Sequence, residues 1–176
     1  LRYCLTSLHR FAPWLRRIHL ITDNQRPAFL DKALQRQYKV TIVDHREIFR
    51  DYEWALPTFN SRSIETVIWR APELSDRFIY FNDDFVLTRP TNPDDFFTRD
   101  QVNLRGSWQS LHMPGPIGLA TNRAANQIAK KFFGVTRTMH LLAQQRGAHL
   151  AGARKRYFRS PHVPHPLKRD TLADFY

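Results

Sequence analysis

The spacing of hydrophobic residues predicts three short buried strands in the first hundred residues. The runs Ile18–Thr22, Val40–Val43 and Phe78–Phe81 are rich in β-branched and aromatic side chains, and each is followed by polar residues. Strands as apolar as the third suit the middle of a sheet that is covered on both faces.

Helical patterns lie before and between these strands. They cover Leu1–Phe11, Pro27–Tyr38 and a segment that begins at Asn60 or Ser61 and stops before Pro72. Helices between apolar strands are typical of the crossover connections of a parallel sheet. We therefore expect an α/β fold in which a mainly parallel sheet is flanked by helices.

Polar side chains at the strand ends predict where a ligand would bind. Asp23 follows the first strand, Asp44 and His45 follow the second, and Asn82–Asp84 follow the third. Parallel pairing would gather these residues along one edge of the sheet, where ligands of open α/β sheets bind. The helix that begins near Asn60 would direct free backbone N–H groups toward the same edge, where they could bind an anion.

The adjacent carboxylates of Asp83 and Asp84 allow two interpretations. Neighbouring negative charges repel, so a divalent cation such as Mg2+ would stabilise them. Asn and Asp are also ordinary turn residues, and Asn82–Asp84 could be a solvated turn after a core strand. The residues themselves leave both interpretations open.

The second half of the chain has a less regular pattern. Residues 106–118 predict a loop that either faces the substrate as a lid or simply lies on the surface. Asn122–Phe133 and Thr136–Arg146 have helical patterns, which we expect Gly134 and Gly147 to end.

Composition indicates one domain of ordinary globular character. The chain has 176 residues, of which 42% are hydrophobic, enough for one substantial core. A single cysteine, Cys4, excludes an internal disulfide framework and a cysteine-rich zinc site. No apolar run reaches the roughly 18 to 20 residues needed to cross a bilayer. Because the chain starts at Leu1 without a signal-peptide pattern, we expect it to be part of a longer protein.

Positive charge is concentrated in the second half. The formal net charge is +11; residues 1–100 hold 15 Lys and Arg against 14 Asp and Glu, whereas residues 101–176 hold 12 against 2. Such a surface attracts phosphate groups, whether in nucleic acid, an anionic bilayer or a small phosphorylated substrate.

Two histidines fixed by prolines, His162 and His165, are further candidates for chemistry. They could be zinc ligands, a general base with its partner, or exposed turn residues. We favour the base, because imidazole titrates near neutral pH and no further zinc ligands occur at a recognisable spacing.

The chain has no Gly-x-Ser-x-Gly motif and no glycine-rich phosphate loop. Carboxylates, a divalent cation, histidine and many arginines together suit transfer at a phosphate or diphosphate.

Several long motifs in the same order resemble those of the Stealth family, which contains bacterial capsular polysaccharide phosphotransferases and the catalytic part of the animal N-acetylglucosamine-1-phosphotransferase. The resemblance is dense over residues 1–100 and resumes near the end of the chain. The segments that carry it are Leu1–Leu8, Ala12–Trp14, Ile21–Asp23, Leu56–Ser61, Ile64–Glu65, Phe78–Asp84 and His162–Lys168.

The resemblance implies a Rossmann-like, nucleotide-sugar-binding core of the GT-A-like type. It also implies transfer of a sugar-1-phosphate from a nucleotide-sugar to an acceptor hydroxyl, which forms a phosphodiester and releases a nucleoside monophosphate. The expected donor is a UDP-sugar, and the acceptor is an oligosaccharide or polysaccharide of a capsule or other surface polymer. We treat residues 1–176 as a single catalytic-domain fragment, since the family's opening and closing segments would lie outside it: residues 1–100 form the α/β core, and residues 101–176 form its basic, mainly helical and loop part.

The resemblance also assigns roles to individual residues. Asp83 and Asp84 would bind Mg2+ or Mn2+, with Glu65 as a weaker candidate ligand, and His162 or His165 would deprotonate the acceptor hydroxyl. Asn60, Ser61, Arg62 and Asp23 are the candidates for contact with the nucleotide-sugar. Where many members have histidines after the residue equivalent to Glu65, this chain has Thr66–Trp69, so no histidine role transfers there.

Two other functions remain as alternatives. A metal-dependent glycosyltransferase would use the same kind of donor but would release a nucleoside diphosphate. A module that binds nucleic acid or an anionic membrane would use only the basic second half, and it leaves the acidic strand ends unexplained. We expect no nucleic-acid partner, and we expect a cytoplasmic protein that contacts the inner face of the bacterial membrane.

Overall fold

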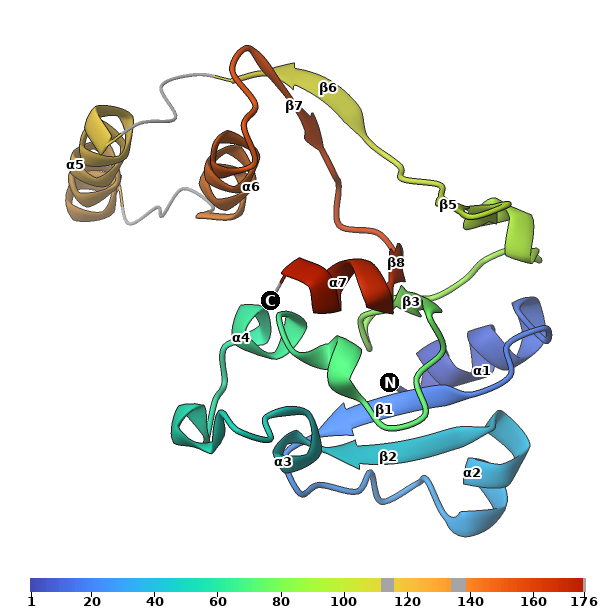
Figure 1. The fold of residues 1–176 in the computed structure, drawn as a ribbon. Coiled ribbons are helices and arrows are strands. Elements are labelled where there is room, and N and C mark those ends of the chain that lie inside the picture. Colours follow the sequence, from blue (N-terminus) through green and yellow to red (C-terminus); the bar gives the residue numbers. More distant parts are fainter. Residues whose placement is uncertain (112–115, 134–138, 176) are drawn as a thin grey trace. The chain divides into compact units, whose positions relative to one another are not determined.

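The computed structural model describes residues 1–111, 116–133 and 139–175, which form two compact units (Figure 1). The first unit contains Leu1–Leu104 and Val163–Tyr176, and the second contains Arg105–His162. In chain order, the first unit contains α1 (Arg2–Phe11), β1 (Ile18–Thr22), α2 (Lys32–Tyr38), β2 (Val40–Asp44), α3 (His45–Ile48), η1 (Glu53–Ala55), α4 (Ser61–Glu65), η2 (Ile68–Arg70), β3 (Arg77–Tyr80), η3 (Pro93–Asp95), β4 (Phe97–Thr98), β5 (Gln101–Val102), β8 (His165–Lys168) and α7 (Arg169–Phe175). The second unit contains β6 (Ser107–Ser110), α5 (Pro116–Phe133), α6 (Met139–Leu150) and β7 (Arg156–Arg159).

β1 and β2 form the parallel pair that the apolar runs predict, with α2 in the connection between them (Figure 1). The register joins Ile18 to Val40 at one end and Thr22 to Asp44 at the other. The carboxyl ends of β1 and β2 therefore lie at the same edge, as expected.

α2 begins later than the sequence predicted. Asp31 is its N-cap, and its side chain accepts a hydrogen bond from the backbone N–H of Leu34. Pro27 lies in the preceding turn, which the Leu30 N–H closes by donating to the Pro27 carbonyl. The predicted start at Pro27 is wrong because an aspartate side chain can bond the orphan amides of the first turn, whereas proline only tolerates that position.

The third strand does not extend the parallel pair. β3 pairs antiparallel with β8, so that Tyr80 lies opposite His165. In the described part of the chain, β1–β2 is the only parallel ladder, and β3–β8, β4–β5 and β6–β7 are antiparallel. The mixed helix-and-strand composition is confirmed, but the sheets are small and the expected mainly parallel sheet is not what these ladders form. The prediction failed because β8, the partner of β3, was not recognised as a strand. β8 contains Pro166, and proline inside a run of residues argues against a strand.

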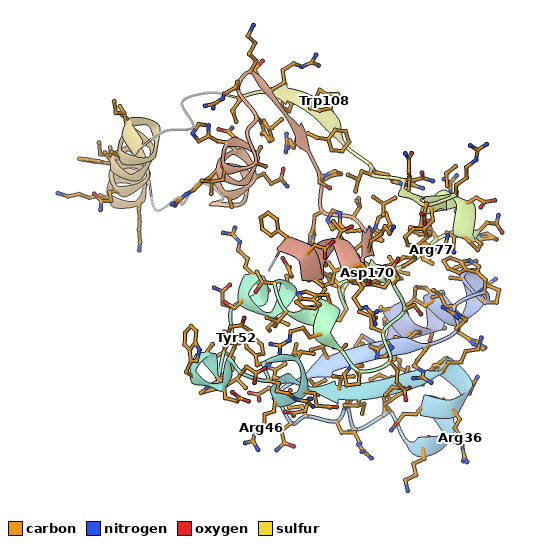
Figure 2. All side chains as sticks on the ribbon, in the orientation of Figure 1. Arg36, Arg46, Tyr52, Arg77, Trp108 and Asp170 are labelled. Carbon is orange, nitrogen blue, oxygen red and sulfur yellow. The ribbon has the colours of Figure 1, made fainter. Side chains whose placement is uncertain are left out.

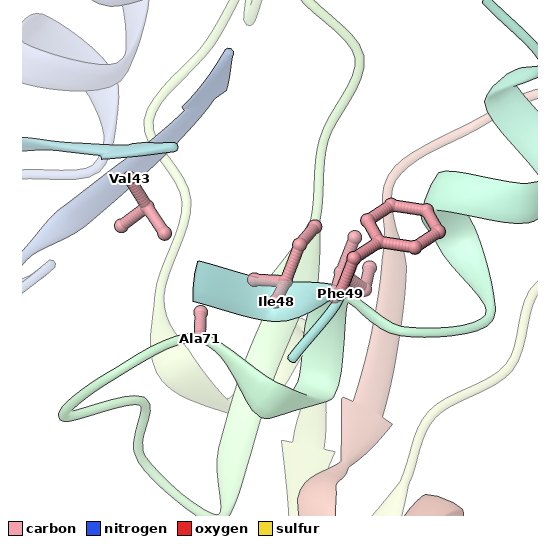
Figure 3. Close-up of a cluster of buried hydrophobic side chains, with 5 residues drawn as sticks. Val43, Ile48, Phe49 and Ala71 are labelled. Carbon is pink, nitrogen blue, oxygen red and sulfur yellow. The ribbon is translucent and has the colours of Figure 1, made fainter. Parts of the chain in front are cut away.

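A shared hydrophobic cluster nevertheless joins the three predicted strands. Val43, Ile48, Phe49, Ile68 and Ala71 are buried together (Figure 3). Ile21 of β1 and both Phe78 and Tyr80 of β3 pack against this cluster. Full burial of a side chain such as Ile48 contributes about 1.5 to 3 kcal/mol to folding, so the cluster fixes the end of β3 near the ends of the parallel pair.

The helix that begins after Asn60 is shorter than expected. It is α4, which ends at Glu65, and a separate 3-10 turn, η2, carries Ile68 into the cluster. The predicted N-cap at Asn60 is confirmed, and the predicted inward side chains Ile64 and Val67 do pack against the core.

The second unit combines an antiparallel strand pair with two helices. β6 pairs with β7, and Trp108 packs edge-on against Phe158 with 5.6 Å between the ring centroids. β6 and the start of α5 lie within the segment predicted as a loop, so that prediction is wrong for Ser107–Ser110 and for residues 116–118. Gly147 lies inside α6, so the prediction that it ends the helix is wrong. Glycine ends a helix by adopting a left-handed conformation, and Gly147 does not adopt one. The predicted stop at Gly134 and residues 112–115 of the predicted loop fall outside the described residues.

In the portions of the chain with described structure, no helix has the length and the apolar character needed to span a membrane.

Candidate functional site

The acidic residues predicted from the sequence occupy a tight turn directly after β3, which we call the acidic turn (Asn82–Phe85). The Phe85 N–H donates to the Asn82 carbonyl at 3.1 Å, and the rings of Phe81 and Phe85 meet edge to face. Asp83 and Asp84 at its tip are exposed. The turn interpretation of these residues is thus correct, and it leaves both carboxylates open to a ligand.

α1 supports the acidic turn from one side. The Cys4 thiol, on the buried face of α1, donates to the Asn82 carbonyl at 3.8 Å. Burial, and then the negative charges of Asp83 and Asp84, raise the pKa of Cys4 to about 11. A thiol with this pKa stays protonated at neutral pH, so Cys4 is a structural donor and not a nucleophile.

Tyr80, the last residue of β3, links a third carboxylate to this site. Its hydroxyl donates to Oε1 of Glu65 on α4 at 2.8 Å. Burial of the ring, the hydrogen bond to Glu65 and the charges of Glu65, Asp83 and Asp84 all raise the pKa of Tyr80. The phenol is therefore a neutral hydrogen-bond donor. The negative charges of Glu65, Asp83 and Asp84, the three candidate metal ligands, all act on it.

The two candidate histidines belong to different units. His165 is the first residue of β8 and lies directly opposite Tyr80 in the antiparallel ladder. Residues directly opposite in such a ladder project from the same face of the sheet, with Cβ atoms about 4.5 to 5.5 Å apart. His165 is therefore brought to the strand end that carries the acidic turn. His162 belongs to the second unit.

The donor set of the acidic turn fits a hard divalent cation. Mg2+ is commonly bound by one or two carboxylates, with water and substrate phosphate completing its shell. Asp83 and Asp84 provide such a pair, and both are accessible. Within the described residues, no three His, Cys, Asp or Glu side chains are grouped closely enough to form a metal site by themselves. Glu65, the weaker candidate ligand, accepts the hydrogen bond from Tyr80 through one of its two carboxylate oxygens.

The residues expected to contact phosphate lie at the start of α4. The Asn60 side chain accepts a hydrogen bond from the Arg62 N–H at 3.1 Å, so this amide is already satisfied by the cap. Ser61 and Arg62 are exposed. Because Glu65 lies on the same short helix, the structure joins these candidates to the acidic turn through the Glu65–Tyr80 hydrogen bond.

Asp44, at the end of β2, has a structural role. Its carboxylate accepts hydrogen bonds from the backbone N–H groups of Arg46 and Asn24 at 2.9 and 2.7 Å, and Glu47 completes a capping box at the start of α3. The hydrogen bond from Arg46, with smaller contributions from Asn24 and nearby cations, lowers the pKa of Asp44. Asp23, at the end of β1, is exposed beside this cap.

Two residues of the site were missed by the sequence analysis, Cys4 and Tyr80. The signal for Tyr80 was present: a tyrosine in an otherwise apolar strand needs a partner for its hydroxyl. No comparable signal existed for Cys4, because its acceptor is a backbone carbonyl 78 residues away.

Known proteins with related sequences show which family this chain is similar to. The profile described as Stealth protein CR2, conserved region 2, matches residues 1–105. That match ends where the first part of the first unit ends and the second unit begins.

Curated relatives extend the similarity over nearly the whole chain. An exopolysaccharide phosphotransferase of Streptomyces coelicolor is 36% identical over 99% of this chain and 27% of its own length. The receptor polysaccharide phosphotransferase WefC of Streptococcus oralis and the capsular polysaccharide phosphotransferase WcwK of Streptococcus pneumoniae are each 32% identical over 97% of this chain and 54% of their own lengths. The chain thus spans about half or less of the length of these relatives.

Proposed function

Because this chain belongs to the Stealth family, we propose that it is part of a phosphotransferase of surface polysaccharide synthesis and that the acidic turn lies in its catalytic site. The relatives are named for exopolysaccharide, receptor polysaccharide and capsular polysaccharide phosphotransfer, which supports this class of reaction. The observation that carries the assignment to a site is the convergence of Asp83, Asp84, Glu65 and His165 around Tyr80.

The proposed reaction moves a hexose-1-phosphate from a nucleotide-sugar, of which a UDP-sugar is our preferred donor. The acceptor hydroxyl oxygen attacks the phosphorus next to the sugar, and a new P–O bond forms. The P–O bond to the nucleotide breaks, and the nucleoside monophosphate leaves with the electron pair. The product is a phosphodiester between the donor sugar and the acceptor saccharide, and the hydroxyl proton passes to a base.

His165 is our candidate for this base. It lies at the same strand end as the acidic turn, and a neutral imidazole can take a hydroxyl proton near pH 7. The Tyr80 hydroxyl would hold the Glu65 carboxylate in place, so that it presents a fixed polar group to the acceptor. His162 remains the second candidate.

Asp83 and Asp84 would bind Mg2+ or Mn2+ together with the donor diphosphate, and the bound cation would supply neutralisation of the phosphate charge. Asn60, Ser61, Arg62 and Asp23 are the candidates for contact with the nucleotide-sugar. A Rossmann-like, GT-A-like core is part of the same proposal, and the β1–α2–β2 unit is the portion of the fold that supports it.

We also propose a cytoplasmic location at the inner face of the bacterial membrane. Residues 105–162, the second unit, contain ten Lys and Arg and neither Asp nor Glu. A segment with this charge is attracted to anionic lipid headgroups. Lys130 and Lys131, both exposed on α5, are the residues to replace in a vesicle-binding test.

The deciding experiment identifies the nucleotide that the full-length protein releases from a panel of UDP-sugars with Mg2+ and a capsule oligosaccharide. We expect UMP and a phosphodiester-linked product, and we expect Asp83→Asn/Asp84→Asn to lower the rate by about a hundredfold or more. Asp94→Asn, which changes an exposed carboxylate of η3, is the matched control and should leave the rate unchanged.

Two results would contradict the proposal. Release of UDP would assign the protein to glycosyl transfer, the alternative that uses the same donor. Full activity of Asp83→Asn/Asp84→Asn would remove the acidic turn from the catalytic site.

A further inference from the structure

A second charged feature of the first unit lies at the opposite end of the β1–β2 pair from Asp23 and Asp44. It is a cavity of about 380 Å³, which we call the basic hollow. Val40 and Thr41 at the start of β2 line it, together with residues of α2. Figure 2 shows Arg36 at this end of the strand pair and Arg46 at the other. Five cationic side chains line the hollow: Arg16, Arg17, Lys32, Arg36 and Lys39.

Three of these cations are held in place by neighbouring groups. The Lys39 ammonium donates to the carbonyl oxygens of Pro13 and Leu15 at 3.2 and 2.8 Å, and Arg16 donates to the Ser75 hydroxyl at 2.8 Å. Arg17 pairs with Glu73. None of the lining residues is acidic, and among the described residues Arg17 alone of the five forms an ion pair.

The other two cations, Lys32 and Arg36, lie four residues apart on α2. Residues at this spacing are neighbours on a helix surface, and like charges there destabilise the helix. Lys32 is also in the first turn, where the helix dipole disfavours a positive charge. Neither side chain has a hydrogen-bond or ion-pair partner among the residues described. These positions are unfavourable in the free protein, and an anion bound between them would reduce the repulsion.

The lining of the hollow indicates the chemistry of that anion. Clustered Arg and Lys recognise phosphate, and the volume lies in the range of small-ligand sites, so it exceeds what one phosphate group fills. Thr41 adds a hydroxyl group, and Gln35, whose amide nitrogen donates to the Leu30 carbonyl, adds a side-chain oxygen; both suit sugar hydroxyls. The lining has no aromatic side chain on which a nucleic-acid base could stack. It also lacks the exposed apolar side chains that accompany cations on a membrane-inserting surface.

We propose that the basic hollow binds a phosphodiester-bearing glycan at a site separate from the acidic turn. The identity of the glycan as acceptor or product chain rests on the proposed function; the anion site itself does not. Each transfer adds one phosphodiester to the polymer, so a chain that has already been extended carries the charge that the hollow recognises. The hollow would hold this chain by its existing phosphates and thereby favour extended acceptors over neutral ones.

The test measures binding to the full-length protein by calorimetry, with four probes. They are a phosphodiester-linked hexose oligosaccharide, the same oligosaccharide joined by glycosidic bonds alone, inorganic phosphate, and vesicles of anionic phospholipid. The variant is Lys32→Gln/Arg36→Gln, which keeps good helix formers at two exposed positions and so should fold. The matched control is Lys130→Gln/Lys131→Gln, a second pair of exposed helical lysines in the other unit.

We expect the phosphodiester oligosaccharide to bind more tightly than its neutral counterpart, and Lys32→Gln/Arg36→Gln to weaken that binding by about tenfold or more. Lys130→Gln/Lys131→Gln should change it little. Asp83→Asn/Asp84→Asn should lower turnover by about a hundredfold or more and leave this binding intact, which separates a failure of the hollow from a failure of the proposed reaction.

Four results would overturn the proposal. Unchanged binding in Lys32→Gln/Arg36→Gln would exclude the hollow. An equal loss in this variant and in Lys130→Gln/Lys131→Gln would mean that net charge alone attracts the glycan. Inorganic phosphate that binds as tightly as the glycan would make the hollow a free-phosphate site. Vesicle binding that is lost in Lys32→Gln/Arg36→Gln and kept in the control would make it a lipid site.

Discussion

Tyr80 of β3 and His165 of β8 lie directly opposite each other in an antiparallel ladder, and the Tyr80 hydroxyl donates to Glu65. This pair connects three segments that are distant in sequence: the acidic turn after β3, the short helix α4 and the proline-containing strand near the end of the chain. A phenol, a carboxylate and an imidazole are thereby gathered at one strand end.

The first prediction concerns the two histidines. If His165 is the general base, His165→Gln should lower the rate of nucleotide release by about 100-fold to 10,000-fold, because base catalysis contributes rate factors of that size. His162→Gln is the control and should have a much smaller effect. The measurement is the initial rate across a pH series. A larger loss in His162→Gln would transfer the role to His162.

The second prediction concerns the Tyr80–Glu65 hydrogen bond. Tyr80→Phe removes a donor to a carboxylate that remains solvent-accessible, so the free energy of unfolding should fall by about 1 kcal/mol. Tyr38→Phe removes a longer, neutral contact with Thr6 and should cost less than about 0.5 kcal/mol. Urea unfolding of both variants checks this, and equal losses would mean that the charge of Glu65 adds nothing.

The third prediction follows from the pKa of Cys4, which is raised from 9.0 to about 11. The unfolded thiol loses its proton at a lower pH than the folded thiol, so raising the pH favours the unfolded state. Stability from this group should be complete below pH 9 and should decline by about 3 kcal/mol as the pH rises to about 11.

Cys4→Ala provides the control for this effect. The variant should start less stable, because it leaves a small cavity under α1, but it should lose less stability between pH 9 and 11 than the wild-type chain. Identical slopes of unfolding free energy against pH would contradict the raised pKa. Slow alkylation of the folded wild-type thiol at neutral pH is a second readout.

The fourth prediction concerns the cap at Asp44. Asp44→Ala removes the acceptor for the Arg46 and Asn24 amides, so stability near neutral pH should fall by about 1 to 2 kcal/mol. Because the pKa of Asp44 is lowered from 3.8, the wild-type advantage should persist above that pH and disappear as the pH falls through the lowered value. Asp23→Ala, at the neighbouring exposed position, should change stability by less than about 0.5 kcal/mol.

The fifth prediction compares two glycines of the second unit. A Cβ at Gly106 would collide with the carbonyl oxygen of Arg159 and with the Phe158 ring, so Gly106→Ala should destabilise by about 1 to 3 kcal/mol. Gly147 lies inside α6 with open space around it, so Gly147→Ala should stabilise by about 0.5 to 1 kcal/mol. Thermal unfolding distinguishes the two directions, and destabilisation by both would contradict the helix at Gly147.

Local patterns predicted individual elements in the first half of the chain. The bounds of β1 are those of the apolar run, and Asn60 caps α4 as its side chain suggested. Both features depend on neighbouring residues, which a single sequence displays. β8 was not predicted because a proline-containing strand gains its identity from a distant partner, and no periodicity within His165–Lys168 reveals that β3 is this partner.

The same distinction applies to the functional residues. The acidic turn was visible because its residues are adjacent in sequence. The Tyr80–Glu65 contact and the position of His165 opposite Tyr80 depend on long-range pairing, which the sequence does not display. The basic hollow was missed for another reason: the near-neutral balance of residues 1–100 concealed five cations that the fold of α2, β2 and the segment before β1 brings together.

The interruption of the first unit by residues 105–162 has a consequence for biosynthesis. A ribosome releases β3 before the whole second unit, and β8 comes only after it. During that interval β3 is an unpaired edge strand with apolar side chains, the kind of surface on which nascent chains aggregate or recruit chaperones. The order of synthesis thus makes the pairing of β3 with β8 a late event, and only that pairing brings His165 to the strand end that carries the acidic turn.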